Sequence, residues 1–247
     1  MNPTIFNRFE RKYLITTSEK DELLSYFKTY LIDDPFSKNG EHYTIHNLYF
    51  DTPDYGVIRN SIQKPKYKDK LRLRSYKLPL EPFDIVFLEI KKKFEGRINK
   101  RRLDLTYQEA LDYIYHQKTP ILTTYEQKQI FAEIDYFINI HKAKPGAYIK
   151  YDRVALMSET DDLRVTFDHD ILFRNKNVSF ESTSGLPILA SKDLWLMEVK
   201  SDRNFPLWLV SKLSKHTLYS QSFSKYGKAY QQYLTGGNTD DFILYHY

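Results

Sequence analysis

Alternating polar and apolar residues run through most of the chain and predict an extensive β structure. Around position 72, the side chains of Lys70, Arg72 and Arg74 alternate with those of Leu71 and Leu73. Successive side chains of a strand point to opposite faces, so this segment has one cationic face and one apolar face. The same alternation predicts strands at residues 6–16, 43–51, 67–77, 84–93, 97–106, 147–158, 163–175 and 193–202.

Apolar residues at helical spacing occupy the segments between these strands. They predict helices over residues 17–31, 54–63, 106–116 and 125–142, and one or two more over 205–234. Ser18 and Asp21 have the spacing of a capping box at the start of the first helix. The fold class is therefore α+β with mostly antiparallel strands. We expect residues 1–247 to form a single domain with a C-terminal helical segment at about 205–234.

The charged faces of the strands raise the question of which face is inside. A sheet with its polar face in water is the ordinary arrangement. Here, however, Arg and Lys greatly outnumber Asp and Glu on these faces, and the amphipathic helices need the apolar face to pack against. Buried cations are costly unless an anion neutralises them. We therefore predict a closed eight-stranded antiparallel β-barrel, with helices packed outside and a basic interior built around a polyanion.

Composition agrees with a polyanionic partner and excludes several other classes. The net charge is +5 with a sequence pI near 9.0, which favours phosphate compounds, nucleic acid or an anionic surface as partners. The chain has no cysteine, so disulfides and thiolate chemistry are excluded. No run approaches the roughly 18 apolar residues of a spanning helix, and the N-terminal residues lack a signal-peptide pattern. We expect a cytoplasmic protein that does not itself span a membrane.

Nine short motifs, in this order and spacing, resemble a known family. They read ERKYLI, NLYFDTPDY, KLRLRSY, FLEIKKK, NKRRLDL, YDRVAL, LRVTFDHDI, LMEVKS and FSKYGKAY, and they extend from about residue 6 to 230. Together they resemble the VTC (vacuolar transporter chaperone) domain, the polyphosphate polymerase branch of the CYTH-like triphosphate tunnel metalloenzymes. The resemblance implies a tunnel whose basic lining holds triphosphate and whose acidic residues bind a divalent metal.

Matching motifs assign roles to individual residues. The resemblance implies catalytic phosphate contacts for Lys12, Arg72, Arg74, Lys91, Arg153 and Lys225. It implies a phosphate-binding lining that adds Arg8, Lys70, Lys100, Arg102, Arg164 and Lys200. The carboxylates expected to hold Mn²⁺ or Mg²⁺ are Glu198, Glu10 and Glu89, since hard divalent ions prefer carboxylate oxygens.

Several of these assignments have alternatives. Related hydrolases and cyclases begin with an E-x-E-x-K strand, whereas Arg8 occupies the first glutamate position here. This change favours a polymerase or a binding tunnel over a hydrolase. Glu89 has an internal salt bridge as an equal alternative to a metal role. Asp168 either adds to the metal shell or lies at a turn, and Asp170 is expected to end its strand.

The leading functional hypothesis is a metal-dependent polyphosphate polymerase that transfers the γ-phosphoryl group of ATP to a growing chain. Arginine forks suit phosphate oxygens, and phosphoryl transfer needs mainly positioning and charge neutralisation. The alternatives are hydrolysis of tripolyphosphate or nucleoside triphosphate, and a non-catalytic polyphosphate or inositol-phosphate binding module. Nucleic acid is not an expected partner, because only Tyr76 and Tyr151 offer stacking surfaces on the cationic face. A separate membrane partner stays open.

Overall fold

The computed structural model describes residues 5–6, 9–37, 41–95 and 97–235. The strands are β1 (Ile5–Phe6), β2 (Phe9–Thr16), β3 (Ile32–Asp33), β4 (Tyr43–Asp51), β5 (Tyr67–Ser75), β6 (Ile85–Phe94), β7 (Arg97–Thr106), β8 (Lys144–Met157), β9 (Arg164–Arg174), β10 (Leu186–Pro187) and β11 (Leu194–Ser201). The helices are α1 (Thr17–Phe27), α2 (Gly56–Ile62), α3 (Tyr107–His116), α4 (Tyr125–His141), α5 (Leu207–Lys215) and α6 (Lys225–Tyr233). The α+β class is confirmed.

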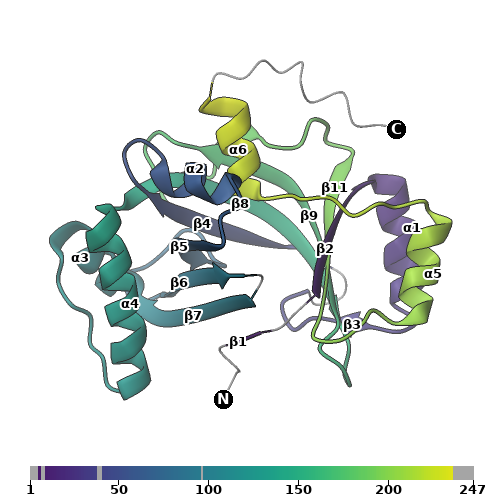
Figure 1. The fold of residues 1–247 in the computed structure, drawn as a ribbon, viewed down its shortest axis with the longest axis horizontal. Helices are drawn as coiled ribbons and strands as arrows, with labels where there is room; N and C mark the ends of the chain where they lie inside the picture. The colour runs from purple at the N-terminus through teal and green to yellow at the C-terminus, as the bar shows by residue number, and fades with distance from the viewer. Residues whose placement is uncertain (1–4, 7–8, 38–40, 96, 236–247) are drawn as a thin grey trace.

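All strands belong to one antiparallel sheet (Figure 1). Its order is β1-β7-β6-β5-β4-β8-β9-β11-β2, with β10 paired to β9 and β3 paired to β8. The sheet has 11 strands, and no ladder joins β2 to β7 within the described residues. The expected closed eight-stranded barrel is therefore not confirmed, although the long strands β2, β4–β9 and β11 correspond to the eight segments that the alternation predicts.

The two edges of the sheet are nevertheless connected by the N-terminal segment. β1 pairs with β7 at one edge, and β2 pairs with β11 at the other. Phe6 and Phe9 are three residues apart, so their Cα atoms are at most about 11 Å apart. The sheet must therefore curl enough to bring its first and last strands close together.

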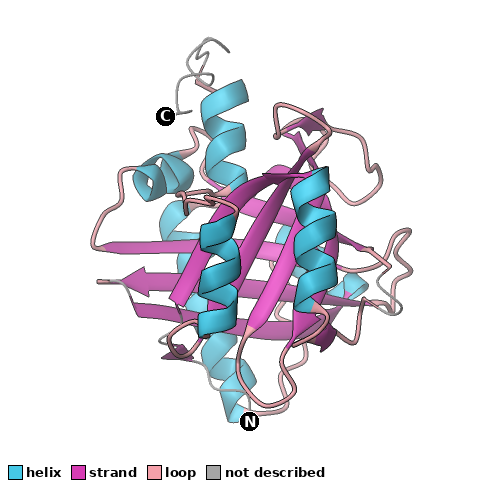
Figure 2. Ribbon diagram, turned by 90° about the vertical axis from the view of Figure 1, so that its right-hand side faces the viewer, coloured by secondary structure: helices cyan, strands magenta, loops and turns pink. Residues whose placement is uncertain are grey.

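Four helices cover the outer face of the curled sheet. Leu71, Leu73 and Ile90 of β5 and β6 are buried against α3 and α4, which contribute Tyr113 and Ile134. On the opposite flank, α1 and α5 bury Phe27 and Leu209 against β2, β8, β9 and β11. Figure 1 shows these helix pairs at the two sides of the sheet, and α1 and α5 lie across the near strands in Figure 2. The apolar side of each alternating strand therefore faces outward, toward helices, as expected.

The remaining helices, α2 and α6, lie together at one end of the sheet (Figure 1). They pack with Ile45, Ile149 and Phe173 in a third cluster, to which α6 contributes Tyr226 and Ala229. The C-terminal helical segment expected at 205–234 thus consists of two helices: α5 packs on the outer face of the sheet, and α6 packs beside α2 at one end of it. In the described part of the chain, no helix is both long and apolar enough to cross a bilayer.

Two local expectations are wrong. Helix α1 is capped by Thr16, whose side chain accepts from the Glu19 amide while Glu19 accepts from the Thr16 amide. The capping box therefore begins two residues before Ser18, because the helix starts directly at the end of β2. Asp170 does not end its strand, since β9 continues to Arg174. It has a φ of 45° beside a register shift between β8 and β9, which is the geometry of a bulge.

Candidate functional site

The charged side chains of the alternating strands meet on the inner face, which is the face opposite α1, α3, α4 and α5. Cross-strand register places them next to one another. Arg72 lies opposite Glu89, which lies opposite Arg102, and Lys70 lies opposite Lys91. On the other flank, Arg153 lies opposite Asp168, and Glu198 lies opposite Lys12. The sequence pattern therefore identified the correct face, and the sheet gathers these side chains into one site.

We distinguish two walls of this site. The cation-rich wall comprises the inner-face residues Lys70, Arg72, Arg74, Glu89, Lys91, Lys100 and Arg102 on β5, β6 and β7. The charge-matched wall comprises Glu10, Lys12, Arg153, Asp168, Glu198 and Lys200 on β2, β8, β9 and β11, together with Lys225 of α6. The walls influence each other directly, because Lys91 of β6 lowers the pKa of Glu10 on β2.

Asp168 is the centre of the charge-matched wall. It is fully buried and binds Arg153 through two contacts, Nε to Oδ1 at 2.6 Å and Nη2 to Oδ2 at 2.8 Å. Lys225 Nζ donates to Asp168 Oδ2 at 2.6 Å. A paired fork of this kind fixes both orientation and charge. Asp168 therefore positions two of the expected phosphate-binding cations, which gives it a structural role beyond the alternatives weighed from sequence.

Glu198 joins the lysines of the same wall. Its Oε2 accepts from Lys200 Nζ at 2.7 Å, and its Oε1 lies 3.6 Å from both Lys12 Nζ and Lys225 Nζ. Lys12 Nζ also lies 3.0 Å from Glu10 Oε1. Glu198 is buried, with 7% of its surface exposed. The wall is thus a chain of alternating charges.

The lysines keep these carboxylates ionised. Burial alone would raise the pKa of Glu198, but Lys200, Lys225 and Lys12 together hold its pKa well below the ordinary value. Burial likewise acts against ionisation of Glu10, yet Lys200, Lys12 and Lys91 lower its pKa to about 2. Negative charge persists here at neutral pH.

In the cation-rich wall, one buried carboxylate, that of Glu89, forms ion pairs with several cations. Glu89 Oε2 accepts from Arg72 Nε at 2.7 Å and lies 3.8 Å from Arg74 Nε. Glu89 Oε1 lies 2.6 Å from Lys100 Nζ. Despite the opposing effect of burial, these cations hold the pKa of Glu89 well below its usual range. The salt-bridge alternative for Glu89 is therefore what the structure contains.

Polar side chains hold the two arginines in place, and two of them, Asn47 and Tyr49, were not identified from the sequence. Arg72 Nη1 donates to Tyr49 Oη at 3.3 Å. Arg74 donates through Nε to Asn47 Oδ1 at 3.0 Å and through Nη2 to Tyr151 Oη at 3.2 Å. Asn47 and Tyr49 alternate on β4 in phase with the inner face, and this parity was the available signal.

The lysines of this wall have lowered pKa values, and burial is the largest cause for each of them. Burial, with Lys68 and Lys91 nearby, lowers the pKa of Lys70 to about 7. Burial, with Arg72 and Arg74 nearby, lowers the pKa of Lys100 to about 8 despite Glu89. The pKa of Lys91 is also lowered by burial and by Lys200. Many protein atoms lie around Lys91, which lowers its pKa, but the side chain is still exposed to solvent. Lys91 therefore lies where the inner face is accessible from outside.

Two expected residues lie at the margins, and one lies outside the described residues. Arg164 pairs with Asp34 and also donates to Tyr43 Oη at 3.3 Å. Arg102 pairs with Asp104 and stacks on the Phe87 ring at 4.6 Å. Asp34 follows the short strand β3, in a segment without alternation, so sequence offered no signal for it. Arg8 lies outside the described residues.

The arrangement of the carboxylates shows whether the expected divalent metal ion could bind here. Glu10 and Glu198 both approach Lys12 Nζ, at 3.0 and 3.6 Å, so both carboxylates border the same ammonium group. Among the described residues, no group of three or more potential metal ligands occurs. Mg²⁺ typically binds one or two protein carboxylates and completes its shell with substrate phosphates and water. Glu10 and Glu198 supply the number of carboxylates in that donor set, and each also contacts a lysine. Glu89 contacts both Arg72 and Lys100.

Comparison with solved structures shows a related fold. A candidate adenylate cyclase from Bacillus halodurans superposes with a TM-score of 0.55 at 16% identity, covering 90% of this chain and 96% of that chain. A candidate adenylate cyclase from Vibrio parahaemolyticus gives a TM-score of 0.45 at 13% identity, with 92% and 98% covered. No curated protein matches the chain. The sequence model of the VTC domain matches residues 7–234, and the chain therefore belongs to the VTC domain family.

Proposed function

We propose that this protein is a metal-dependent polyphosphate polymerase that transfers the γ-phosphoryl group of ATP to the end of a growing polyphosphate chain. The observation that carries the proposal is the cation-rich wall. Lys70, Lys91 and Lys100 have pKa values lowered mainly by burial and further by neighbouring cations, and this wall has one carboxylate, Glu89, among six cations. A phosphate chain would supply the missing negative charge along the whole wall.

We propose further that the inner face acts as a tunnel. The short connection between β1 and β2 links the two edges of the sheet. The positive charge of Lys91 on β6 also lowers the pKa of Glu10 on β2, so the two walls are close enough to interact. A chain passing between the two walls would contact cations on both sides. Such a channel would retain the product between successive transfers, which favours polymer over short products.

The residues then take distinct roles. Arg72 and Arg74, held by Tyr49 and Tyr151, present guanidinium groups that suit phosphate oxygens. In the reaction, a terminal oxygen of the chain forms a bond to the γ-phosphorus as the bond to ADP breaks. Lys12, Lys91, Arg153 and Lys225 would stabilise the negative charge on the transferred group.

Glu10 and Glu198 would hold the divalent ion, Mn²⁺ or Mg²⁺. Such an ion supplies charge neutralisation on phosphate oxygens. The residues of this chain that act with it are Lys12 and Lys200, which contact the same carboxylates at 3.0 and 2.7 Å. Their role is to keep Glu10 and Glu198 ionised and correctly oriented.

The comparisons support action on nucleoside triphosphates but leave the reaction as a proposal. The Bacillus halodurans protein, which shares the fold, is described as a candidate cyclase of adenine nucleotides. A non-catalytic polyphosphate-binding module is the second candidate, and one observation favours it: Glu10, Glu198 and Asp168 are all occupied by lysine or arginine. A cytoplasmic location, a single domain and a separate membrane partner stay predictions.

Incubation with ATP and Mn²⁺, followed by product gels and assays of ADP and orthophosphate, tests the proposal. We expect long polymer with equimolar ADP in the wild type and in the surface control Lys118→Ala. Arg72→Ala and Glu198→Gln, verified as folded by circular dichroism, should lose more than 100-fold in rate, since removing one transition-state charge contact costs about 10²–10³. Orthophosphate without polymer would indicate a hydrolase. Polyphosphate binding without turnover would indicate the binding module.

A further inference from the structure

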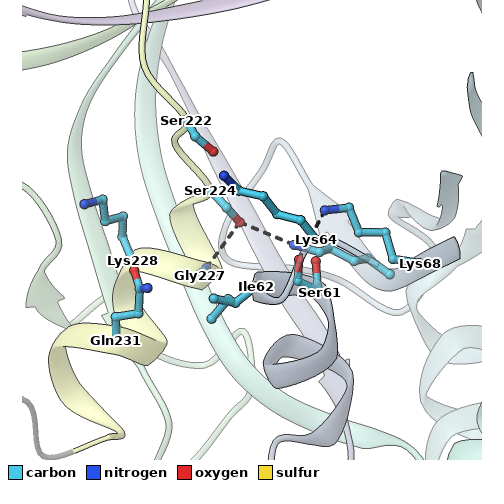
Figure 3. A pocket seen from close by; sticks show the side chains of 10 residues that line it. Ser61, Ile62, Lys64, Lys68, Ser222, Ser224, Gly227, Lys228 and Gln231 are labelled. Carbon is cyan, nitrogen blue, oxygen red and sulfur yellow. Dashed lines mark hydrogen bonds between the residues drawn. The ribbon is translucent and has the colours of Figure 1, made fainter. Parts of the chain in front are cut away.

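A separate basic pocket lies between α2, the start of β5 and α6 (Figure 3). Its volume is about 300 Å³, roughly ten times the ~30 Å³ share of one water molecule. Figure 3 shows residues of α6 on one side and residues of the α2–β5 connection on the other. Its polar lining includes Ser61, Lys64, Lys68, Lys70, Ser224 and Lys228. A pocket of this size admits a phosphate group.

The residues that line the pocket are basic in composition. Four lysines line the pocket, and no aspartate or glutamate is among its lining residues. Burial lowers the pKa of Lys68, with Lys93 and Lys64 adding to this effect, and burial also lowers the pKa of Lys228. Lys68 Nζ contacts only a neutral acceptor, the carbonyl oxygen of Ser61, at 3.1 Å among its described hydrogen bonds. The chemistry favours an anion with several oxygens.

Lys70 connects this pocket to the inner face. It lies opposite Lys91 in the cation-rich wall, and its Nζ donates to Ser224 Oγ at 3.3 Å inside the pocket. Its pKa is lowered by Lys68 on the pocket side and by Lys91 and Lys12 on the inner side. The next residue of α6, Lys225, turns to Asp168. The start of α6 therefore separates two basic regions that Lys70 bridges.

Ser224 and Gly227 at the start of α6 form one side of the pocket. A Cβ atom at Gly227 would lie 3.1 Å from Cβ of Ser224, the N-cap of the same helix, and at an ordinary contact distance of 3.7 Å from Ile62 Cγ1 of α2. Ser224 also accepts from the Gly227 amide at 3.2 Å, which fixes its hydroxyl at the start of the helix. The pocket is thus built by packed elements and does not depend on surface lysines alone.

We propose that this pocket is a subsite for linear polyphosphate, which binds the units of the chain that extend past Lys70 beyond the inner face. The inference rests on the proposed function, because it extends the path of the same ligand. It predicts a dependence on chain length. Tripolyphosphate fills the inner face alone, whereas a long chain also contacts Lys68 and Lys228.

Binding of tripolyphosphate and of polyphosphate with about 50 units to purified protein tests the subsite by calorimetry. For the variant Lys68→Gln/Lys228→Gln, we expect about tenfold weaker binding of the long chain and unchanged binding of tripolyphosphate. The dependence of long-chain affinity on salt should also become shallower, because fewer cation–phosphate contacts release fewer counterions. The control Lys118→Gln/Lys128→Gln removes the same charge from the exposed α3–α4 region and should change neither affinity.

Lysine acetylation footprinting of the wild type provides a measurement that needs no variant. Long polyphosphate should protect Lys68 and Lys228, and tripolyphosphate should not. Equal loss of both affinities in the variant, or no protection by the long chain, would overturn the subsite. So would inositol hexakisphosphate protecting these lysines while long polyphosphate does not. Failure of the wild type to bind either chain would instead overturn the proposed function.

Discussion

The two walls of the inner face are built alike but balance their charge in opposite ways. In the charge-matched wall, the carboxylates of Glu10, Asp168 and Glu198 contact four cations, Lys12, Arg153, Lys200 and Lys225. In the cation-rich wall, the single carboxylate of Glu89 stands against six cations and contacts Arg72 and Lys100. The charge of the first wall is therefore nearly balanced within the protein itself, whereas the second wall has a large excess of positive charge. The difference separates residues that position the site from residues that await a ligand.

The largest expected effect comes from breaking the charge-matched wall. Asp168→Asn keeps the shape of the side chain but removes the paired carboxylate of Arg153 and leaves Lys225 with Glu198 alone, at 3.6 Å. We expect the free energy of unfolding to fall by about 3–5 kcal/mol, measured by urea denaturation at pH 7. Asp104→Asn, which removes an exposed pairing of Arg102, is the control and should cost less than about 1 kcal/mol. Equal small losses would show that Asp168 does not organise this wall.

The second largest effect expected is a pH dependence of polyphosphate binding, which arises from Lys70 in the cation-rich wall. Lys70 has a pKa of about 7 in the free protein, and a bound polyanion raises it toward the ordinary value. Binding therefore takes up protons between pH 7 and 9, and the affinity for long polyphosphate should fall by about tenfold over this range. Calorimetry in buffers of different ionisation enthalpy measures the uptake directly. Lys70→Arg, which stays charged, should flatten the profile, and an unchanged profile would assign the protons elsewhere.

The stability of the free protein should rise with pH in both the acid and the alkaline range. Glu10, with its lowered pKa of about 2, stabilises the fold above the ordinary glutamate range, and this stability is lost as the pH falls from about 4.5 to 2. Lys70 binds fewer protons in the folded than in the unfolded state between pH 7 and 10. Its contribution to stability therefore rises with pH.

A substitution in the cation-rich wall should be tolerated without ligand. Lys91→Met removes a cation whose pKa is already lowered by burial and by Lys200. Because Lys91 is exposed, we expect the free energy of unfolding to change by less than about 1 kcal/mol, while polyphosphate no longer stabilises the protein in thermal melts. A loss of stability as large as that of Asp168→Asn would contradict the proposed difference between the walls.

Much of this arrangement was predictable, and what was missed has a physical cause. The boundaries of residues 43–51 and 97–106 match β4 and β7, because alternation is a local property of a two-faced strand. The division of charge between the walls depends on cross-strand register, which places Asp168 beside Arg153. Nothing within either segment specifies that pairing. The prediction of a closed barrel is not confirmed for a related reason, because alternation within a strand does not determine how the two edges of the sheet meet.

The smallest expected effects are those of removing a helix cap next to each wall, and they should be equal for the two walls. Thr16 joins β2 to α1, and Thr106 joins β7 to α3, each through a capping box with the glutamate three residues later. Either threonine to alanine change should cost about 1 kcal/mol in urea denaturation, without altering polyphosphate affinity. Ser18→Ala should cost much less, because Ser18 lies inside the helix. If Thr16→Ala weakened binding while Thr106→Ala did not, the cap of α1 would be coupled to the site, and the walls would differ in support as well as in charge.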